Sequence, residues 1–133
     1  MFNSEIVEIR SQSDIVVVRQ RVRALAIDLR FSLIEQTKIV TAASELARNT
    51  LDYGKGGTVT LEIVDRFGEV GLKLTFEDQG PGIVDIELAL QDGYTTGKGL
   101  GLGLGGAKRL MSEFVIVSEV GKGTQVTVIR WQR

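Results

Sequence analysis

The sequence predicts an α+β fold with two layers, in which helices cover one face of a sheet that is antiparallel, or mixed but mostly antiparallel. Two observations predict it. Segments with alternating apolar residues occur in pairs that are joined by glycine-containing turns, which is typical of antiparallel hairpins. Two longer segments, residues 15–29 and 32–53, carry apolar residues near helical spacing. The chain lacks the regular strand–helix–strand alternation of a parallel sheet.

The composition narrows the classes of protein. A chain of 133 residues with 43% hydrophobic residues is expected to fold as one domain, residues 1–133. Its 16 basic and 17 acidic residues give a net charge of -1, which argues against a nucleic-acid partner bound through bulk charge. Cysteine and histidine are absent, which excludes thiol chemistry and histidine-based catalysis or metal binding. No signal peptide or membrane span is evident, so we expect a cytoplasmic protein with no membrane partner.

The chain is expected to begin with a strand over residues 5–10, followed by a first helix. Ser13 is the predicted N-cap of this helix, because a serine hydroxyl can accept a hydrogen bond from the free N–H groups of the first turn. Apolar residues then recur near helical spacing from Ile15 to Leu29. Arginines lie between them and form either a solvated face or a binding face.

A second helix is predicted from Ser32 to about Tyr53. Ser32 and Glu35 have the spacing of a capping box, in which each side chain bonds a backbone N–H of the other residue. Helical periodicity separates an apolar arc from an outer, polar arc. Glu45 and Asn49 lie one turn apart on the outer arc. This arc is either an ordinary solvent face or part of a site.

The remaining elements are predicted from alternation and turn residues. Thr58–Val64 and Gly71–Phe76 form an antiparallel hairpin around a turn at Asp65–Gly68. The later elements are a short helical segment within residues 83–91, a helix at 107–111, a strand at 114–120, a turn at 121–124 and a closing strand at 125–131.

An acidic turn follows the second hairpin strand. Asp78 stands at the strand end, and Gly80 and Gly82 flank Pro81, the chain's only proline. The glycines leave the backbone bare, so a flat ligand could lie against it. A carboxylate can accept two hydrogen bonds from an amine, which suits the exocyclic amino group of adenine. The alternative interpretation is a tight turn without a ligand.

Glycine occupies nearly every second position from Gly97 to Gly106. A loop that binds phosphates through its backbone N–H groups requires residues without side chains. A predicted helix follows the glycine stretch, so its N-terminus would face the phosphates. A flexible linker is the alternative, but linkers favour serine rather than the regular leucines found here. The stretch is neither a Walker A loop nor a Rossmann fingerprint. A eukaryotic-type kinase is excluded because its catalytic motif contains histidine.

Four elements together resemble the GHKL (Bergerat-fold) family of ATP-binding domains. Residues 45–49 look like its N box, residues 78–82 like its first glycine box and residues 97–104 like its second. Residues 121–124 look like the closing Gly-x-Gly-Thr. Each motif is weak alone, but all four occur in the family's order between Ser32 and Arg133. Within the family, the chain is similar to the small bacterial anti-sigma-type serine kinases and to the switch kinases of the stressosome.

The resemblance implies a role for particular residues. Asn49 would be a ligand of Mg²⁺ shared with ATP, Asp78 would bind the adenine amino group, and Thr124 would assist through water. Glu45 would be the catalytic base. The residues implied to hold the nucleotide are Asn49, Asp78, Gly80, Gly82, Gly97, Lys98, Gly99, Leu100, Gly101, Leu102, Gly103, Leu104 and Thr124. The chain departs from the family at Tyr53, where many members have histidine.

The resemblance also implies a function. The family members that this chain resembles are serine/threonine protein kinases, which use ATP and Mg²⁺ to phosphorylate a STAS-domain antagonist of the RsbS or RsbR type. Such proteins switch partners in bacterial stress and sigma-factor signalling, and they also bind a phosphatase of the RsbU type. The alternative is an ATP-dependent binding module, an anti-sigma factor or phosphatase activator, with little kinase activity. An ATPase of the chaperone or repair type is disfavoured because no coupling domains are present.

Overall fold

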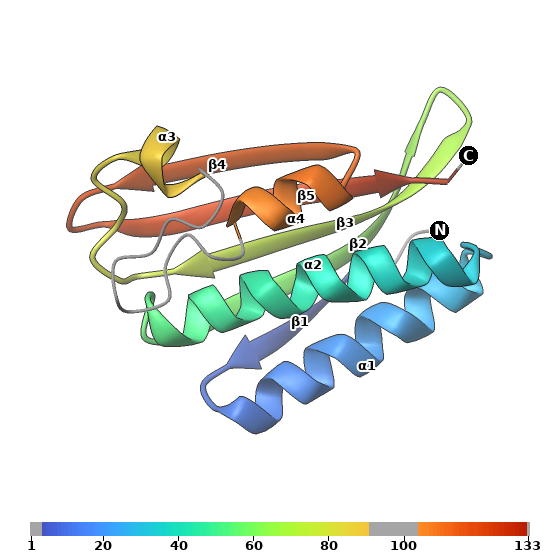
Figure 1. Cartoon of the computed structure of the whole chain (residues 1–133). Helices are drawn as coiled ribbons and strands as arrows, with labels where there is room; N and C mark the ends of the chain where they lie inside the picture. The colour runs from blue at the N-terminus through green and yellow to red at the C-terminus, as the bar shows by residue number, and fades with distance from the viewer. Residues whose placement is uncertain (1–3, 91–103, 133) are drawn as a thin grey trace.

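The structure is a computed structural model, and it describes residues 4–90 and 104–132. Five strands and four helices are found in this described part, and Figure 1 shows their arrangement. The strands are β1 (Ser4–Ile9), β2 (Gly57–Arg66), β3 (Glu69–Asp78), β4 (Glu113–Glu119) and β5 (Gly123–Trp131). The helices are α1 (Gln12–Asp28), α2 (Leu33–Asp52), α3 (Ile86–Ala89) and α4 (Leu104–Leu110).

The strands form one sheet in the order β1-β2-β3-β5-β4. Each of the four pairings is antiparallel, so the sheet is the antiparallel form of the two that the sequence allowed. The helices α1, α2 and α4 lie on one face of this sheet, with α2 over its middle (Figure 1). The predicted two-layer α+β fold is therefore confirmed.

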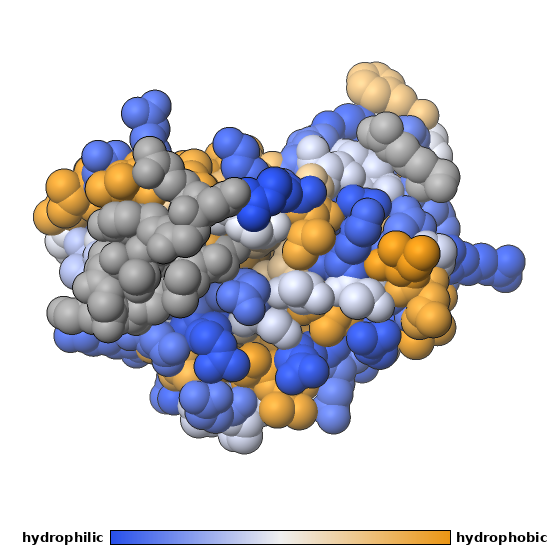
Figure 2. All heavy atoms as spheres, viewed as in Figure 1, coloured by the Kyte–Doolittle hydropathy of each residue, from blue (hydrophilic) through white to orange (hydrophobic). Residues whose placement is uncertain are grey.

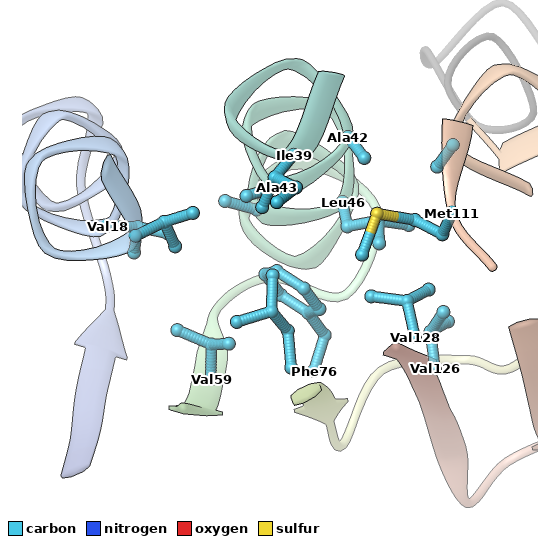
Figure 3. Close-up of a cluster of buried hydrophobic side chains, with 14 of the residues drawn as sticks. Val18, Ile39, Ala42, Ala43, Leu46, Val59, Phe76, Met111, Val126 and Val128 are labelled. Carbon is cyan, nitrogen blue, oxygen red and sulfur yellow. The ribbon is translucent and has the colours of Figure 1, made fainter. Parts of the chain in front are cut away.

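The core lies between α2 and the sheet. Figure 3 shows side chains of α2 pointing toward Phe76 and Val59 on the strands below. Phe76 is among the largest fully buried side chains, and Leu46 of α2 is buried as well. The buried residues of α2 are Ile39, Val40, Ala42, Ala43, Leu46, Ala47 and Thr50. They include the apolar arc that the helical period predicts, which leaves Glu45 and Asn49 away from the centre of the core.

The start of α2 agrees with the prediction, whereas the start of α1 does not. The Ser32 hydroxyl accepts a hydrogen bond from the Glu35 N–H at 3.1 Å, and the Glu35 carboxylate accepts one from the Ser32 N–H at 3.2 Å. The N-cap of α1 is Ser11, so the prediction of Ser13 was wrong. The Asp14 carboxylate accepts from the Ser11 N–H at 3.2 Å, which places the helix start two residues earlier.

A two-residue turn joins β2 to β3. Phe67 and Gly68 have φ angles of 53° and 83°, and positive φ at both positions is required in the turn that suits the twist of a hairpin. The Phe67 side chain is 99% exposed. The predicted hairpin is confirmed, and its strands extend further toward the turn than the alternation indicated.

The hairpin end of the sheet carries a side-chain cluster formed by Trp131, Arg66 and Glu113. The Trp131 ring lies against Gly71, where an added Cβ would be 2.7 Å from a ring carbon. The Glu113 carboxylate accepts from the Trp131 indole N–H at 2.8 Å and pairs with Arg66 at 2.6 Å. The Arg66 guanidinium lies 4.7 Å from the centre of the indole ring. These contacts hold β2, β4 and β5 together.

The helix-bearing surface carries both hydrophilic and apolar groups. Figure 2 shows apolar groups at several places on this face, and one such place is at the right, where α1 runs into α2. Ile27, Leu33 and Ile34 are 53%, 70% and 70% exposed there. Within residues 4–90 and 104–132, the helices are too short or too polar to cross a membrane.

Candidate functional site

A small pocket lies between the second half of α2 and the adjacent ends of β3 and β5. Most of its wall is apolar, and its polar side chains come from α2, β3 and β5. The lining residues are Leu46, Asn49, Thr50, Tyr53, Phe76, Asp78, Ile83, Leu104, Thr124 and Val126. Asn49, Asp78, Leu104 and Thr124, which the sequence assigned to one site, therefore meet at one pocket. A concave, largely apolar pocket with a few convergent polar groups is the usual form of a small-molecule site.

Asp78 supplies the carboxylate of this pocket. It is the last residue of β3, paired in the sheet with Thr124 of β5. Its side chain accepts a hydrogen bond from the Gly80 N–H at 2.9 Å. Burial raises the pKa of Asp78, and the backbone N–H groups of Gly80 and Thr124 offset part of that effect. Across the described residues, no lysine or arginine forms an ion pair with Asp78. The carboxylate therefore retains acceptor capacity for a ligand.

Asn49 supplies an amide on the opposite wall. The Asn49 Nδ2 atom is buried and has no hydrogen-bond partner among the residues that the structure describes. Most buried polar atoms have such a partner, so an unpaired one beside a pocket points to a ligand or water that completes it. Glu45 lies one turn earlier on α2 and is partly exposed. It does not line the pocket, so the structure places it beside the site rather than in it.

The end of α2 and the acidic turn touch backbone to backbone. A Cβ added at Gly54 would lie 2.3 Å from the Asp78 side chain. A Cβ added at Gly80 would lie 2.7 Å from the Gly54 Cα. The sequence predicts that Gly80 leaves room for a flat ligand. In the structure its missing side chain makes room for Gly54, and the same contact brings Asp78 close to α2.

Gly82 is required for a different reason. Its φ angle is 80°, a conformation that favours glycine, and an added Cβ would lie 2.3 Å from the Glu119 carbonyl oxygen. The Gly82 carbonyl accepts a hydrogen bond from the Tyr53 hydroxyl at 2.7 Å. The turn is thus held against β4 on one side and the end of α2 on the other.

Two site residues were missed by the sequence analysis. Ser118 on β4 accepts a hydrogen bond from the Ile83 N–H at 2.8 Å, and its hydroxyl lies 2.7 Å from that of Thr124. Ser118 thereby links the acidic turn to the pocket wall. Tyr53 was noted only as a departure from the family, with no role assigned. None of the three contacts, Ile83 with Ser118, Ser118 with Thr124 and Tyr53 with Gly82, has a local sequence signal, because the partners lie 35, 6 and 29 residues apart.

The second glycine stretch is only partly described. Leu104 is the first residue of α4, is 2% exposed and lines the pocket. The predicted phosphate-binding residues Gly97, Lys98, Gly99, Leu100, Gly101, Leu102 and Gly103 lie outside the described residues. In the part of the chain that the structure describes, no three acidic side chains gather into a metal cluster.

The fold and the pocket define the class of protein. The family described as histidine kinase-, DNA gyrase B- and HSP90-like ATPase matches residues 34–133, and the chain belongs to this family. Among characterised relatives, the chain is similar to the serine/threonine-protein kinase RsbT of Bacillus subtilis (strain 168), with 46% identity over 133 residues and 100% of both chains covered. It is also 36% identical over 115 residues to the anti-sigma F factor of Geobacillus kaustophilus (strain HTA426), covering 81% of this chain and 77% of that one.

Solved structures share the fold. The structure of the RsbU and RsbW domains of a Mycobacterium tuberculosis protein matches with a TM-score of 0.64 and 21% identity. That match covers 100% of this chain and 33% of the other. The SiaB–SiaC complex of Pseudomonas aeruginosa matches with a TM-score of 0.55 and 13% identity, covering 99% and 89%. At these identities the likeness concerns the fold alone.

Proposed function

We propose that this protein is an ATP- and Mg²⁺-dependent serine/threonine protein kinase that acts as a partner-switching regulator. The observation that carries the proposal is the pocket in which Asp78 and Asn49 meet at a mostly apolar wall. Membership of the ATPase family and full-length similarity to a serine/threonine-protein kinase support it. ATP is supplied in the cytoplasm, which is where such a kinase would act.

Asp78 binds the adenine in this proposal. Its carboxylate can accept from the exocyclic amine, and the apolar side chains of Phe76, Ile83 and Val126 can cover the ring faces. Thr124 lies beside Asp78 in the sheet and lines the same pocket, so it is placed to assist through water. Gly80 and Gly82 shape the turn, and Leu104 closes the pocket from α4. Residues 97–103 would hold the phosphates.

Asn49 is the proposed protein ligand of Mg²⁺. The unpaired, buried atom of this amide is Nδ2, a donor, which fits a bound group or water at this wall. The side-chain oxygen of the same amide would be the ligand of the ion. Mg²⁺ is usually held by one or two protein oxygens together with phosphates and water, so a single amide oxygen is an ordinary share. The bound ion would neutralise charge that develops on the transferred phosphoryl group.

Glu45 is the proposed general base. It lies one turn before Asn49 on the outer face of α2, outside the pocket and partly exposed to solvent. There it can accept the proton of a substrate serine or threonine hydroxyl as that oxygen bonds to the γ-phosphorus. The bond between the γ-phosphorus and the bridging oxygen breaks, and ADP leaves. Catalysis of this kind depends chiefly on positioning and charge.

The proposed substrate is a STAS-domain protein of the RsbS or RsbR type, and a phosphatase of the RsbU type is the proposed second partner. Both follow from the family resemblance together with the similarity to RsbT. A second function is an ATP-dependent binding switch with little phosphoryl transfer. The similarity to anti-sigma F factors favours it as the alternative.

The test is incubation of the protein with labelled ATP, Mg²⁺ and purified STAS-domain proteins. We expect label on the STAS-domain protein that is stable in acid and labile in alkali, as for a phosphorylated hydroxyl. Binding of the STAS-domain protein in the presence of ATP, without any transfer of label, would support the binding switch instead. The absence of both nucleotide binding and transfer would contradict the proposal.

A further inference from the structure

The turn at residues 80–83 is held from both layers of the fold. On the sheet side, the Pro81 carbonyl accepts from the Gly121 N–H at 2.8 Å, and the Ile83 N–H donates to Ser118 at 2.8 Å. On the helix side, the Tyr53 hydroxyl donates to the Gly82 carbonyl at 2.7 Å. Among the described residues, this hydrogen bond joins the C-terminal end of α2 to the turn.

Tyr53 is positioned by the helix that carries Asn49. It is the C-cap residue of α2, and its N–H donates to the Asn49 carbonyl at 3.0 Å. The two side chains lie one turn apart, and both line the pocket. Ile83, next to the tethered carbonyl, lines the pocket from the turn. The Tyr53 side chain therefore reaches from the end of α2, on one side of the pocket, to the 80–83 turn on the other side.

We propose that Tyr53 is a positioning residue for nucleotide binding: its hydroxyl holds the 80–83 turn at the distance from α2 that the nucleotide requires. This inference rests on the proposed kinase function, since it concerns the same pocket. A pocket whose walls are already set does not need to be ordered when the ligand binds, so the tether lowers the cost of binding. Phosphoryl transfer occurs beyond this wall, near Glu45, and does not involve the hydroxyl.

The test compares Tyr53→Phe, which removes only the hydroxyl, with the unaltered protein. We expect the dissociation constant for ADP, measured by calorimetry, to rise roughly 2- to 10-fold, the range of one hydrogen bond. The rate of transfer at saturating ATP should stay within about twofold, so the loss falls on KM rather than kcat. Without nucleotide, the Ile83 amide should exchange with solvent several-fold faster, because the turn loses its helix-side contact.

A matched control is Thr37→Val. The Thr37 hydroxyl also donates to a backbone carbonyl on α2, that of Leu33 at 3.0 Å, but on an exposed stretch away from the pocket. Thr37→Val should change neither ADP affinity nor exchange of Ile83. Equal losses in both variants would show a general effect on α2 and overturn the proposal, as would unchanged ADP affinity in Tyr53→Phe.

The two proposals can fail separately. If the unaltered protein binds no nucleotide, the kinase function fails, and the exchange of Ile83 still decides whether Tyr53 holds the turn. If the Ile83 amide exchanges at the same rate in Tyr53→Phe, the Tyr53 hydroxyl does not hold the turn, whatever the measured nucleotide affinity. If the unaltered protein binds ADP and transfers phosphate but Tyr53→Phe does so with the same KM, the kinase function stands and the positioning role falls.

Discussion

The sheet carries a partly buried carboxylate near each end: Asp78, the last residue of β3, and Glu113, the first residue of β4. At the end near the pocket, Asp78 accepts backbone N–H groups but has no cationic partner among the described residues. At the hairpin end, Glu113 pairs with Arg66 and accepts the indole N–H of Trp131. Burial raises the pKa of Asp78, whereas hydrogen bonds from Trp131 and Arg66 lower the pKa of Glu113.

The difference separates a site from a structural contact. Glu113 has donors supplied by the protein itself, so its negative charge is stabilised in the folded chain. Asp78 carries a charge whose burial the fold only partly offsets, and the nearby Asn49 Nδ2 atom has no hydrogen-bond partner among the described residues. Groups left in this state are concentrated at functional sites. We therefore expect substitutions at the two ends to affect different measurements.

The largest effect is expected for Glu45→Gln, at the pocket end. The variant should bind ATP normally but transfer phosphate roughly 10²- to 10³-fold more slowly, because an amide cannot accept the substrate proton. Single-turnover transfer to a STAS-domain protein measures this rate. An unchanged rate would remove Glu45 from the mechanism.

Asp78→Asn should abolish or greatly weaken nucleotide binding. The amide can still accept from Gly80, so the turn should persist, but its amino group would face the amine of adenine. Loss of a specific polar contact to a buried group costs about 1–3 kcal/mol or more, which is at least roughly 5- to 150-fold in affinity. Calorimetry with ADP gives the affinity, and circular dichroism verifies the fold. Unaltered affinity would contradict the role of Asp78.

Trp131→Phe should act on stability alone. The ring still covers Gly71, but the indole N–H bond to Glu113 is lost and the cluster is less well filled. We expect a loss of about 1–2 kcal/mol in the free energy of unfolding, with ADP affinity unchanged. Denaturant unfolding and calorimetry measure the two quantities. A loss of affinity would show that the ends of the sheet are coupled.

The smallest effect is the pH dependence of stability, which should have opposite signs at the two ends. Because the pKa of Asp78 is raised in the folded state, its charge destabilises the chain as pH rises above about 4, so Asp78→Asn should gain stability over the unaltered protein there. Because the pKa of Glu113 is lowered, the unaltered protein should be more stable than Glu113→Gln at neutral pH, and this advantage should vanish as pH falls through the lowered pKa.

Thermal unfolding without nucleotide, from pH 3 to about pH 7, measures both differences. Differences of the same sign for the two variants would show that the environments of Asp78 and Glu113 do not differ in the way that the structure indicates.

The parts of the fold that follow from local pattern were predictable. The capping box at Ser32 and Glu35, the α2 periodicity and the antiparallel hairpin all depend on neighbouring residues, and the structure confirms them. The predicted N-cap of α1 was wrong because two serines, Ser11 and Ser13, can each cap this helix. The Asp14 carboxylate accepts a hydrogen bond from the Ser11 N–H, which favours Ser11. Periodicity alone could not separate them.

Much of the site could not be predicted, because it depends on distant segments meeting. Sequence motifs predicted Asp78 and Asn49 as nucleotide-binding residues, and the structure places both at one pocket. The motifs gave no signal for the contact of Tyr53 with Gly82 or of Ser118 with Ile83. They also explained Gly80 by a ligand, whereas the close neighbour of Gly80 is Gly54.

The contact between Gly54 and Gly80 has a consequence for heritable variation. Every glycine codon becomes an alanine codon through one base change, so Gly54→Ala and Gly80→Ala are easily reached mutations. Each would add a methyl group where 2.3 Å and 2.7 Å are available, and would push the end of α2 away from the acidic turn. Gly54 lies outside the four motif segments at residues 45–49, 78–82, 97–104 and 121–124, yet we expect an allele with alanine there to behave as a loss-of-function allele. Surveys of natural variants should therefore find residue 54 as invariant as Asp78.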